Sequence, residues 1–110
     1  MKTYTPEQVD IVWMNLDPSL RHEQKVRRPA FVLTRKIFNR ARNLVLICPI
    51  TSKSKGYPFQ IEFNSKKVEG VIMIDQIRSV DWQNRKIEFI EKTDKSIILN
   101  VKKVPTSLIE

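Results

Sequence analysis

Apolar and polar residues alternate in short stretches along most of the chain, and turn-forming residues separate these stretches. Alternation with a period of two is typical of a β-strand. The stretches that we expect to form strands are residues 9–16, 30–35, 44–48, 59–63, 70–74 and 86–90. Residues 44–48 are continuously apolar, which favours a strand covered on both faces. Pro29 lacks an N–H for a strand ladder, so we expect it only at the start of a strand.

The same pattern predicts little helix. Residues 37–43 indicate a loop or a single helical turn, and 75–79 a short turn of helix. A terminal helix capped by Thr93 or Asp94 follows, and Pro105 is expected to end it. Six short strands, tight loops and one terminal helix predict a mainly β protein with a small, strongly bent antiparallel sheet or barrel.

Length and composition narrow the class of protein. The chain of 110 residues fits a single domain over residues 1–110. No apolar run reaches the ~20 residues of a membrane span and the start does not have the pattern of a secretory signal, so we expect a cytoplasmic protein without a membrane partner. Cys48 is the single cysteine and lies in an apolar stretch, which predicts a buried, unreactive thiol. With His22 as the single histidine, neither a usual zinc site nor a histidine-based triad can form, and we expect no metal and no cofactor.

Positive charge is concentrated in one part of the chain. Residues 24–61 contain no Asp or Glu, while acidic residues slightly outnumber basic ones elsewhere, so the net charge of +8 is a local feature. The nine basic residues of this basic span are Lys25, Arg27, Arg28, Arg35, Lys36, Arg40, Arg42, Lys53 and Lys55. We interpret the span as a surface for RNA or another polyanion, the alternative being a solvated face that only confers solubility. Tyr57 and Phe38 can stack on bases, or can equally anchor their loops on the core.

Arg28 and Thr51 offer a chemistry for phosphate esters. A guanidinium grips a phosphate through two parallel hydrogen bonds, and a hydroxyl at the end of a neighbouring strand can donate to a developing oxyanion. Glu23 is the carboxylate near this pair and can orient the arginine. The alternative interpretation is structural, with Arg28 as part of a charged strand entry and Thr51 as a β-branched strand end.

Several short motifs in the chain share the order and spacing of one known family. They are Asp10-Ile11-Val12-Trp13 with Asp17-Pro18, Glu23-Gln24, Arg28-Pro29-Ala30 with Val32-Leu33, Pro49-Ile50-Thr51, Ser54-Lys55-Gly56-Tyr57-Pro58-Phe59, and Gly70-Val71 leading to Asp75-Gln76-Ile77-Arg78-Ser79-Val80-Asp81-Trp82. Through these motifs, spread over residues 9–92, the chain resembles the MazF/PemK family of toxin endoribonucleases.

The resemblance implies an SH3-like small antiparallel barrel with a short C-terminal helix, acting as a homodimer. It implies metal-independent cleavage of single-stranded RNA at a short sequence, by attack of a ribose 2′-hydroxyl on the adjacent phosphate. The family's catalytic arginine and threonine fall on Arg28 and Thr51, and its acidic loop residue on Glu23. The candidate RNA-binding residues, from the basic span and from the family's shared segment, are Lys25, Arg27, Lys53, Lys55, Tyr57, Gln76 and Arg78. The usual partner is an antitoxin whose acidic, disordered tail lies in the RNA groove.

The chain departs from the family pattern in three places. Val9 replaces a frequent glycine, which we expect to be without consequence, and Arg27 replaces a small, polar or His residue, which makes the cleft more basic. The tail after Thr93 is β-branched and basic where the family has an acidic, Leu-rich helix, so we expect that helix to be short or shifted. Two alternatives to cleavage remain open, a non-enzymatic gyrase poison of the same fold and an RNA-binding module without activity.

Overall fold

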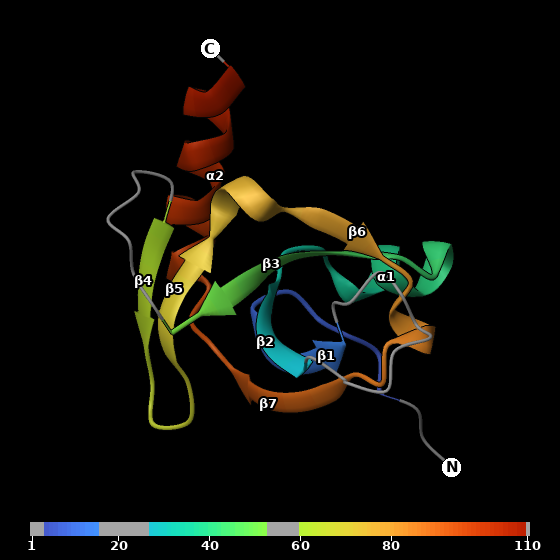
Figure 1. The fold of residues 1–110 in the computed structure, drawn as a ribbon. Helices are drawn as coiled ribbons and strands as arrows, with labels where there is room; N and C mark the ends of the chain where they lie inside the picture. Colours follow the sequence, from blue (N-terminus) through green and yellow to red (C-terminus); the bar gives the residue numbers. More distant parts are fainter. Residues whose placement is uncertain (1–3, 16–26, 53–59, 110) are drawn as a thin grey trace.

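A single curled sheet of antiparallel strands forms most of the structure (Figure 1). The computed structural model describes residues 4–15, 27–52 and 60–109. The strands in these parts of the chain are β1 (Asp10–Asn15), β2 (Arg27–Val32), β3 (Val45–Thr51), β4 (Gln60–Asn64), β5 (Glu69–Met73), β6 (Arg78–Val80) and β7 (Glu88–Lys92). The helices are α1 (Lys36–Arg42), α2 (Ser96–Ile109) and the short 3-10 helices η1 (Ile74–Gln76) and η2 (Trp82–Asn84). The predicted mainly β fold, an SH3-like bent antiparallel sheet with a C-terminal helix, is confirmed.

β3 is the strand around which the sheet curls. The strand order is β4-β5-β3-β2-β1-β7, and β6 also pairs with β3. The first half of β3 pairs with β6, through Val45 and Val80, whereas its last residues pair with β5, through Thr51 and Val71. β2 covers the other edge of β3. As a result, Thr51 lies at the point where the central strand changes its partner.

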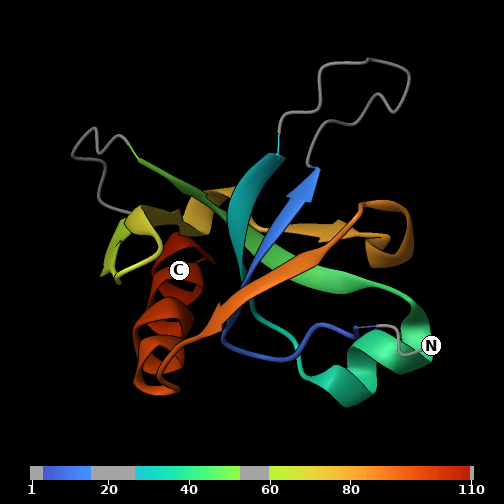
Figure 2. The ribbon, with the colours of Figure 1, turned by 90° about the horizontal axis from the view of Figure 1, so that it is seen from below.

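The core consists of two apolar clusters, one on each face of the curled sheet. Consecutive β1 residues divide between them, with Ile11 in one cluster and Val12 in the other, and both side chains are fully buried. α2 covers the first cluster with Ile98 and Val101, while Trp82 of η2 closes the second. α1 and α2 lie at opposite ends of the sheet (Figure 2). The predicted burial of Cys48 is confirmed, because it lies within the first cluster.

Pairing partners explain why two strands differ from the prediction. β2 begins at Arg27 and includes Pro29, which was expected to open the strand. Its pairing with β3 begins only at Ala30, so at Pro29 the strand is paired with β1 alone, where a residue without an N–H is tolerated. β6 differs from the prediction, because the helical turn expected over 75–79 includes its first two residues; η1 ends before them and β6 pairs with β3 instead.

The last strand and the terminal helix also differ in their limits. β7 begins two residues later than predicted, because Lys86 has a φ of 51° and belongs to the preceding turn. The Asp94 carboxylate accepts a hydrogen bond from Ser96 N at 2.9 Å and so caps α2 as predicted. The helix then continues past Pro105 to Ile109, so the prediction that Pro105 ends it is wrong. The proline removes one hydrogen bond of the helix, and the helix forms on both sides of it.

Val9, the residue that replaces the family's frequent glycine, adopts a left-handed backbone with a φ of 65°. This conformation is strained for a β-branched residue. The expectation that this replacement is without consequence is therefore wrong. Two hydrogen bonds of 2.9 Å hold the residue in place: Val9 N donates to Val32 O, and the backbone N–H of Thr93 donates to Val9 O. The Val9 side chain is only 1% exposed.

Candidate active site

A pocket of about 530 Å³ lies where β2 begins and β3 ends. The residues that line it are Trp13, Arg28, Pro29, Ile50, Thr51, Ser52, Lys67, Val68 and Glu69. Arg28 and Thr51, the two residues predicted to carry the chemistry, are both among them. The register of β2 against β3 pairs Ala30 with Pro49. Arg28 lies two residues before Ala30 and Thr51 two residues after Pro49, so the two residues occupy adjoining ends of two paired strands.

Arg28 and Thr51 are complementary in chemistry. The Arg28 side chain is exposed and Thr51 is half-buried at the strand end. The guanidinium is a planar, charged fork that matches two oxygens of one phosphate group. The hydroxyl beside it can donate a hydrogen bond to a third oxygen. The pair can therefore bind a phosphate and stabilise added negative charge on it.

Gly70 on β5 allows the close backbone approach that positions Thr51. Its φ is +154°, and a Cβ atom built on it would lie 2.2 Å from the Thr51 carbonyl oxygen. Only a residue without a Cβ fits this contact. Gly70 thus holds the end of β3 against β5 at the residue that provides the hydroxyl.

Three further residues of the pocket were missed by the sequence analysis. Trp13 on β1 is 37% exposed, which makes its ring available in the pocket. Lys67, in the turn between β4 and β5, adds a second cation, and its Nζ donates to Ile90 O at 3.4 Å. Glu69, at the start of β5, adds a carboxylate. No local pattern in the sequence distinguishes these residues from those of any strand or polar turn.

The structure places three other predicted RNA-binding residues outside this pocket. Arg27 is the first residue of β2, and its Nη2 forms an ion pair with Glu88 Oε1 on β7 at 2.9 Å. Gln76 is exposed on η1, and Arg78 is half-buried on β6 beside Ile47. Their contacts with RNA stay predictions.

The remaining candidates, Glu23, Lys25, Lys53, Lys55 and Tyr57, lie outside the described residues. Ser52, which immediately precedes Lys53 in the chain, lines the pocket.

Cys48 does not take part in the chemistry of the pocket. Burial and the nearby negative charge of Asp75 raise the pKa of its thiol to about 12, so the sulfur stays protonated at neutral pH. Within the described parts of the chain, no group of three or more His, Cys, Asp or Glu side chains is placed to hold a metal ion. No helix in those parts is long and apolar enough to cross a membrane.

The fold and the pocket together define a class of protein, a small SH3-like barrel with an arginine and a threonine in one surface pocket. Residues 7–105 match the family described as the PemK-like, MazF-like toxin of type II toxin-antitoxin systems, and the chain belongs to this family. The endoribonuclease toxin MazF of Escherichia coli (strain K12) is 37% identical over 82 residues, which are 74% of each chain.

Two solved structures from Deinococcus radiodurans have the same fold. Its MazF superposes with a TM-score of 0.86 and 36% identity, covering 97% of this chain and 98% of that one. A MazF chain in a MazE–MazF crystal structure has a TM-score of 0.81 and 33% identity, covering 96% of this chain and 97% of that one.

Proposed function

We propose that this protein is a sequence-specific endoribonuclease toxin that cleaves single-stranded messenger RNA without a metal ion and thereby stops translation. The observation that carries the proposal is the pocket in which Arg28 and Thr51 meet. The endoribonuclease activity named for the Escherichia coli relative supports the same reaction. The pocket's basic and hydroxyl groups suit a phosphodiester, and its wall includes an exposed tryptophan ring on which a base can stack.

The reaction needs an in-line attack of the ribose 2′-hydroxyl on the adjacent phosphorus. The bond from phosphorus to the 5′-oxygen of the next nucleotide breaks, which leaves a 2′,3′-cyclic phosphate and a 5′-hydroxyl. Negative charge grows on the non-bridging oxygens in the transition state. The Arg28 guanidinium would neutralise this charge and the Thr51 hydroxyl would donate to one of the oxygens.

Two protons must also move in this reaction. The 2′-hydroxyl loses one proton and the departing 5′-oxygen gains one. Arg28 can assist proton transfer from its position at the phosphate. Glu23 remains our candidate for orienting the arginine, and Glu69 is the carboxylate that lines the pocket within the described part of the chain. Glu69→Gln and Glu23→Gln tested in parallel will show which carboxylate the rate depends on.

The test of the proposal is cleavage of a long single-stranded RNA by the purified protein with EDTA present. We expect cleavage to survive the chelator, because the proposed chemistry uses a guanidinium and a hydroxyl. Duplex RNA and DNA should resist, since the first lacks the freedom for in-line attack and the second lacks the 2′-hydroxyl. Cleavage that stops with EDTA and returns with Mg²⁺ contradicts the mechanism. RNA binding without cleavage, or poisoning of DNA gyrase, would favour one of the two alternative functions.

We further propose that the protein is cytoplasmic and acts as a homodimer that a cognate acidic antitoxin neutralises. The MazE–MazF structures of the Deinococcus radiodurans relative support such a partner. A pocket that attracts phosphates also attracts carboxylates, so an acidic segment can occupy it. A monomer at micromolar concentration in light scattering contradicts the dimer, and failure of the neighbouring acidic protein to inhibit cleavage contradicts the partner.

A further inference from the structure

Four cations of the basic span lie away from the pocket, on and next to α1. Arg35 immediately precedes the helix, Lys36 begins it, and Arg40 and Arg42 lie in its last turn, all with exposed side chains. α1 leads into the first residue of β3, whereas Thr51 is the last residue of that strand. At about 3.3 Å per residue, this separates α1 from the pocket by roughly 20 Å along the strand. We call these four residues together with Lys92 on β7 the α1 surface.

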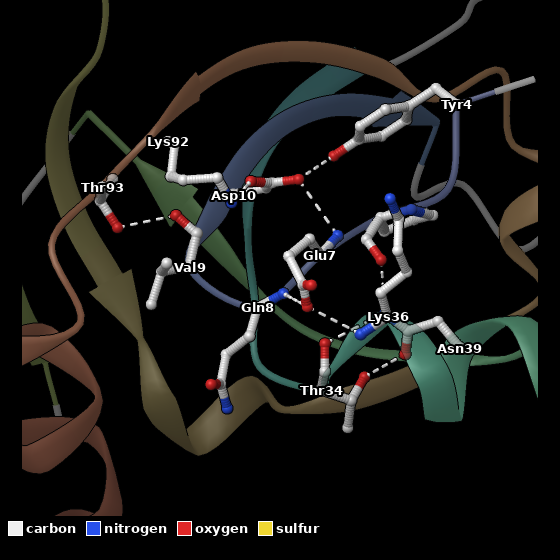
Figure 3. A network of polar contacts seen from close by, with 11 residues as sticks. Tyr4, Glu7, Gln8, Val9, Asp10, Thr34, Lys36, Asn39, Lys92 and Thr93 are labelled. Atoms are coloured by element: carbon white, nitrogen blue, oxygen red, sulfur yellow. Dashed lines mark hydrogen bonds and ion pairs between the residues drawn. The ribbon is translucent and has the colours of Figure 1, made fainter.

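The stability of α1 does not explain the cations at its first turn. The positive end of the helix dipole is the N-terminus, so Arg35 and Lys36 oppose it, although Arg40 and Arg42 at the other end are favourable. The Arg35 side chain makes no capping hydrogen bond. Instead, the Glu7 carboxylate reaches in from the preceding segment and accepts from Lys36 N at 2.7 Å (Figure 3). Arg35 therefore opposes the helix dipole, whereas the opposition of Lys36 is partly offset by the negative charge of Glu7.

A hollow of about 730 Å³ lies between α1 and β7 and combines cations with an exposed ring. Lys36, Arg40 and Lys92 line it together with Phe89, which is 47% exposed. A second hollow of about 480 Å³ continues along α1 to Arg35. Cations beside an exposed aromatic ring are the combination that binds the phosphates and bases of single-stranded nucleic acid.

The two carboxylates of the larger hollow are already engaged (Figure 3). Asp10 is 2% exposed, accepts from Lys92 Nζ at 2.7 Å and from the Tyr4 hydroxyl. Glu7 accepts from Lys36 N and from Gln8 N at 2.8 Å. These acids therefore face protein donors. Three arginine side chains of the α1 surface make no hydrogen bond or ion pair with the residues that the structure describes, namely those of Arg35, Arg40 and Arg42.

We propose that the α1 surface is a second binding site for single-stranded RNA, distinct from the cleavage pocket. Arg35, Lys36 and Arg40 contact phosphates, and a base stacks on Phe89. RNA fits this surface, because each nucleotide offers both a phosphate for the cations and a base for the Phe89 ring. In its biological meaning this inference rests on the proposed function, since the strand held here would be the substrate strand on one side of the cut.

The test compares two variants that each lose three positive charges. The α1 variant is Arg35→Gln/Lys36→Gln/Arg40→Gln, and the control variant is Lys66→Gln/Lys86→Gln/Lys95→Gln, whose side chains are also exposed. The probe is a 2′-O-methyl RNA of about 30 nucleotides, which cannot be cut, and its affinity is measured by fluorescence anisotropy across a salt series. We expect the α1 variant to bind about tenfold or more weakly at low salt. The negative slope of log K against log salt should become shallower by about 2, because three phosphate contacts at about 0.7 each are lost. The slope of the control variant should change little.

A second readout separates this site from the cleavage pocket. On cleavable RNA the α1 variant should raise KM and leave kcat unchanged, and Phe89→Leu should weaken binding without altering the salt slope. Equal losses in the two triple variants, or none in either, overturn the inference. Loss of binding to polyglutamate with RNA affinity unchanged overturns it in favour of an acidic protein. If the wild-type protein binds the RNA through this surface but never cleaves RNA, the second site stands and the proposed enzymatic function fails.

Discussion

Arg28 and Thr51 share a pocket through two features of individual residues. The start of β2 lies beside the end of β3, so both residues line the pocket, and Gly70 lets β5 approach the Thr51 carbonyl. Neither feature requires an unusual side chain. The proposed chemistry therefore needs only a fork-shaped cation, a hydroxyl and one missing Cβ atom.

Removing the proposed catalytic groups should lower the rate of the chemical step. Arg28→Ala should reduce kcat by about 10² to 10³, the scale of losing one preorganised donor to an oxyanion. Arg28→Lys should restore little, because an ammonium cannot replace the bidentate fork. Thr51→Ala should lose activity while Thr51→Ser retains part of it. Single-turnover cleavage of an RNA with one mapped cut site measures these rates.

Lys53→Ala is the contrasting variant, and its position lies outside the described residues. We expect it to weaken binding and leave the saturated rate nearly unchanged, because its predicted role is a phosphate contact in the ground state. Circular dichroism must show that all these variants are folded. Near wild-type cleavage by folded Arg28→Ala and Thr51→Ala proteins would falsify the assigned active site.

Gly70→Ala should damage the pocket from a residue that touches no substrate. Its Cβ would lie 2.2 Å from the Thr51 carbonyl oxygen, and that contact is to backbone that cannot swing away. We expect kcat to fall about tenfold or more and stability to fall by about 1–3 kcal/mol. Rates and urea denaturation should be compared with those of Val71→Ala, which shortens a buried side chain next to it. If Gly70→Ala loses stability but keeps its rate, Gly70 does not position Thr51.

A second prediction at the residue scale concerns the free energy of unfolding of Val9 variants. Val9→Ala removes buried apolar atoms and keeps a left-handed conformation that costs about 1–2 kcal/mol for a residue with a Cβ. Val9→Gly removes the same contacts but also this cost. We therefore expect the glycine variant to be the more stable of the two by about 1 kcal/mol in urea denaturation. The reverse order, which is usual outside left-handed positions, would show that Val9 carries no strain.

At the scale of elements, α1 depends on residues that are distant in sequence. Asn39 on α1 is fully buried. Its side-chain Nδ2 donates to Pro6 O at 2.8 Å and to Thr34 O at 3.0 Å. Its backbone carbonyl accepts from Trp82 Nε1 at 3.0 Å. Glu7 supplies the N-terminal acceptor that the basic first turn lacks. The short helix is thus held by the segment before β1 and by η2.

This dependence predicts a loss of stability in acid. Burial alone would raise the pKa of Glu7, but the N–H groups of Gln8 and Lys36 outweigh it and hold the pKa below its ordinary value. The unfolded chain therefore takes up a proton at higher pH than the folded protein does. The stabilisation by Glu7 is present above the unfolded pKa of about 4.5 and is lost as the pH falls through the lower folded value.

Glu7→Gln should remove this part of the pH dependence. We expect it to lower stability at pH 6 and to narrow its difference from the wild type as the pH approaches 3, in urea denaturation at several pH values. Glu62→Gln is the matched control, because Glu62 is exposed on β4. Parallel curves for Glu7→Gln and the wild type would show that Glu7 does not titrate with folding.

At the scale of the whole molecule, the described residues of the basic span lie in separate places. Arg28 faces the pocket, Arg27 is paired with Glu88, and the residues of α1 lie at the far end of β3. Charge that is continuous in sequence is therefore separated in space by the length of the central strand. An RNA strand long enough to reach both places can bind at more positions than the pocket alone offers.

RNA binding should accordingly weaken steeply with salt. For single strands, log K falls against log salt with a slope of about −0.7 for each phosphate neutralised. We expect a slope steeper than about −2 for the wild-type protein with uncleavable RNA, measured by anisotropy between low and physiological salt. A slope near zero means that the basic span is only a solvated face.

Local patterns were enough to predict most of the strands. Alternation with a period of two and short apolar runs both depend on neighbouring residues alone, so β1, β3, β4 and β5 were predicted with errors of a few residues at their ends. The motifs also led to Arg28 and Thr51, whose presence in one pocket agrees with the resemblance. Charge counting located the basic span, because counting requires no geometry.

Only the tertiary structure decided which residues meet. Trp13 joins the pocket from β1, and Lys67 and Glu69 join it from the hairpin of β4 and β5. Arg27 pairs with Glu88, 61 residues away. β6 exists because β3 offers it an edge, and α2 passes Pro105. Pairing between distant segments depends on how the sheet curls, and that curl leaves no period in the sequence of either segment.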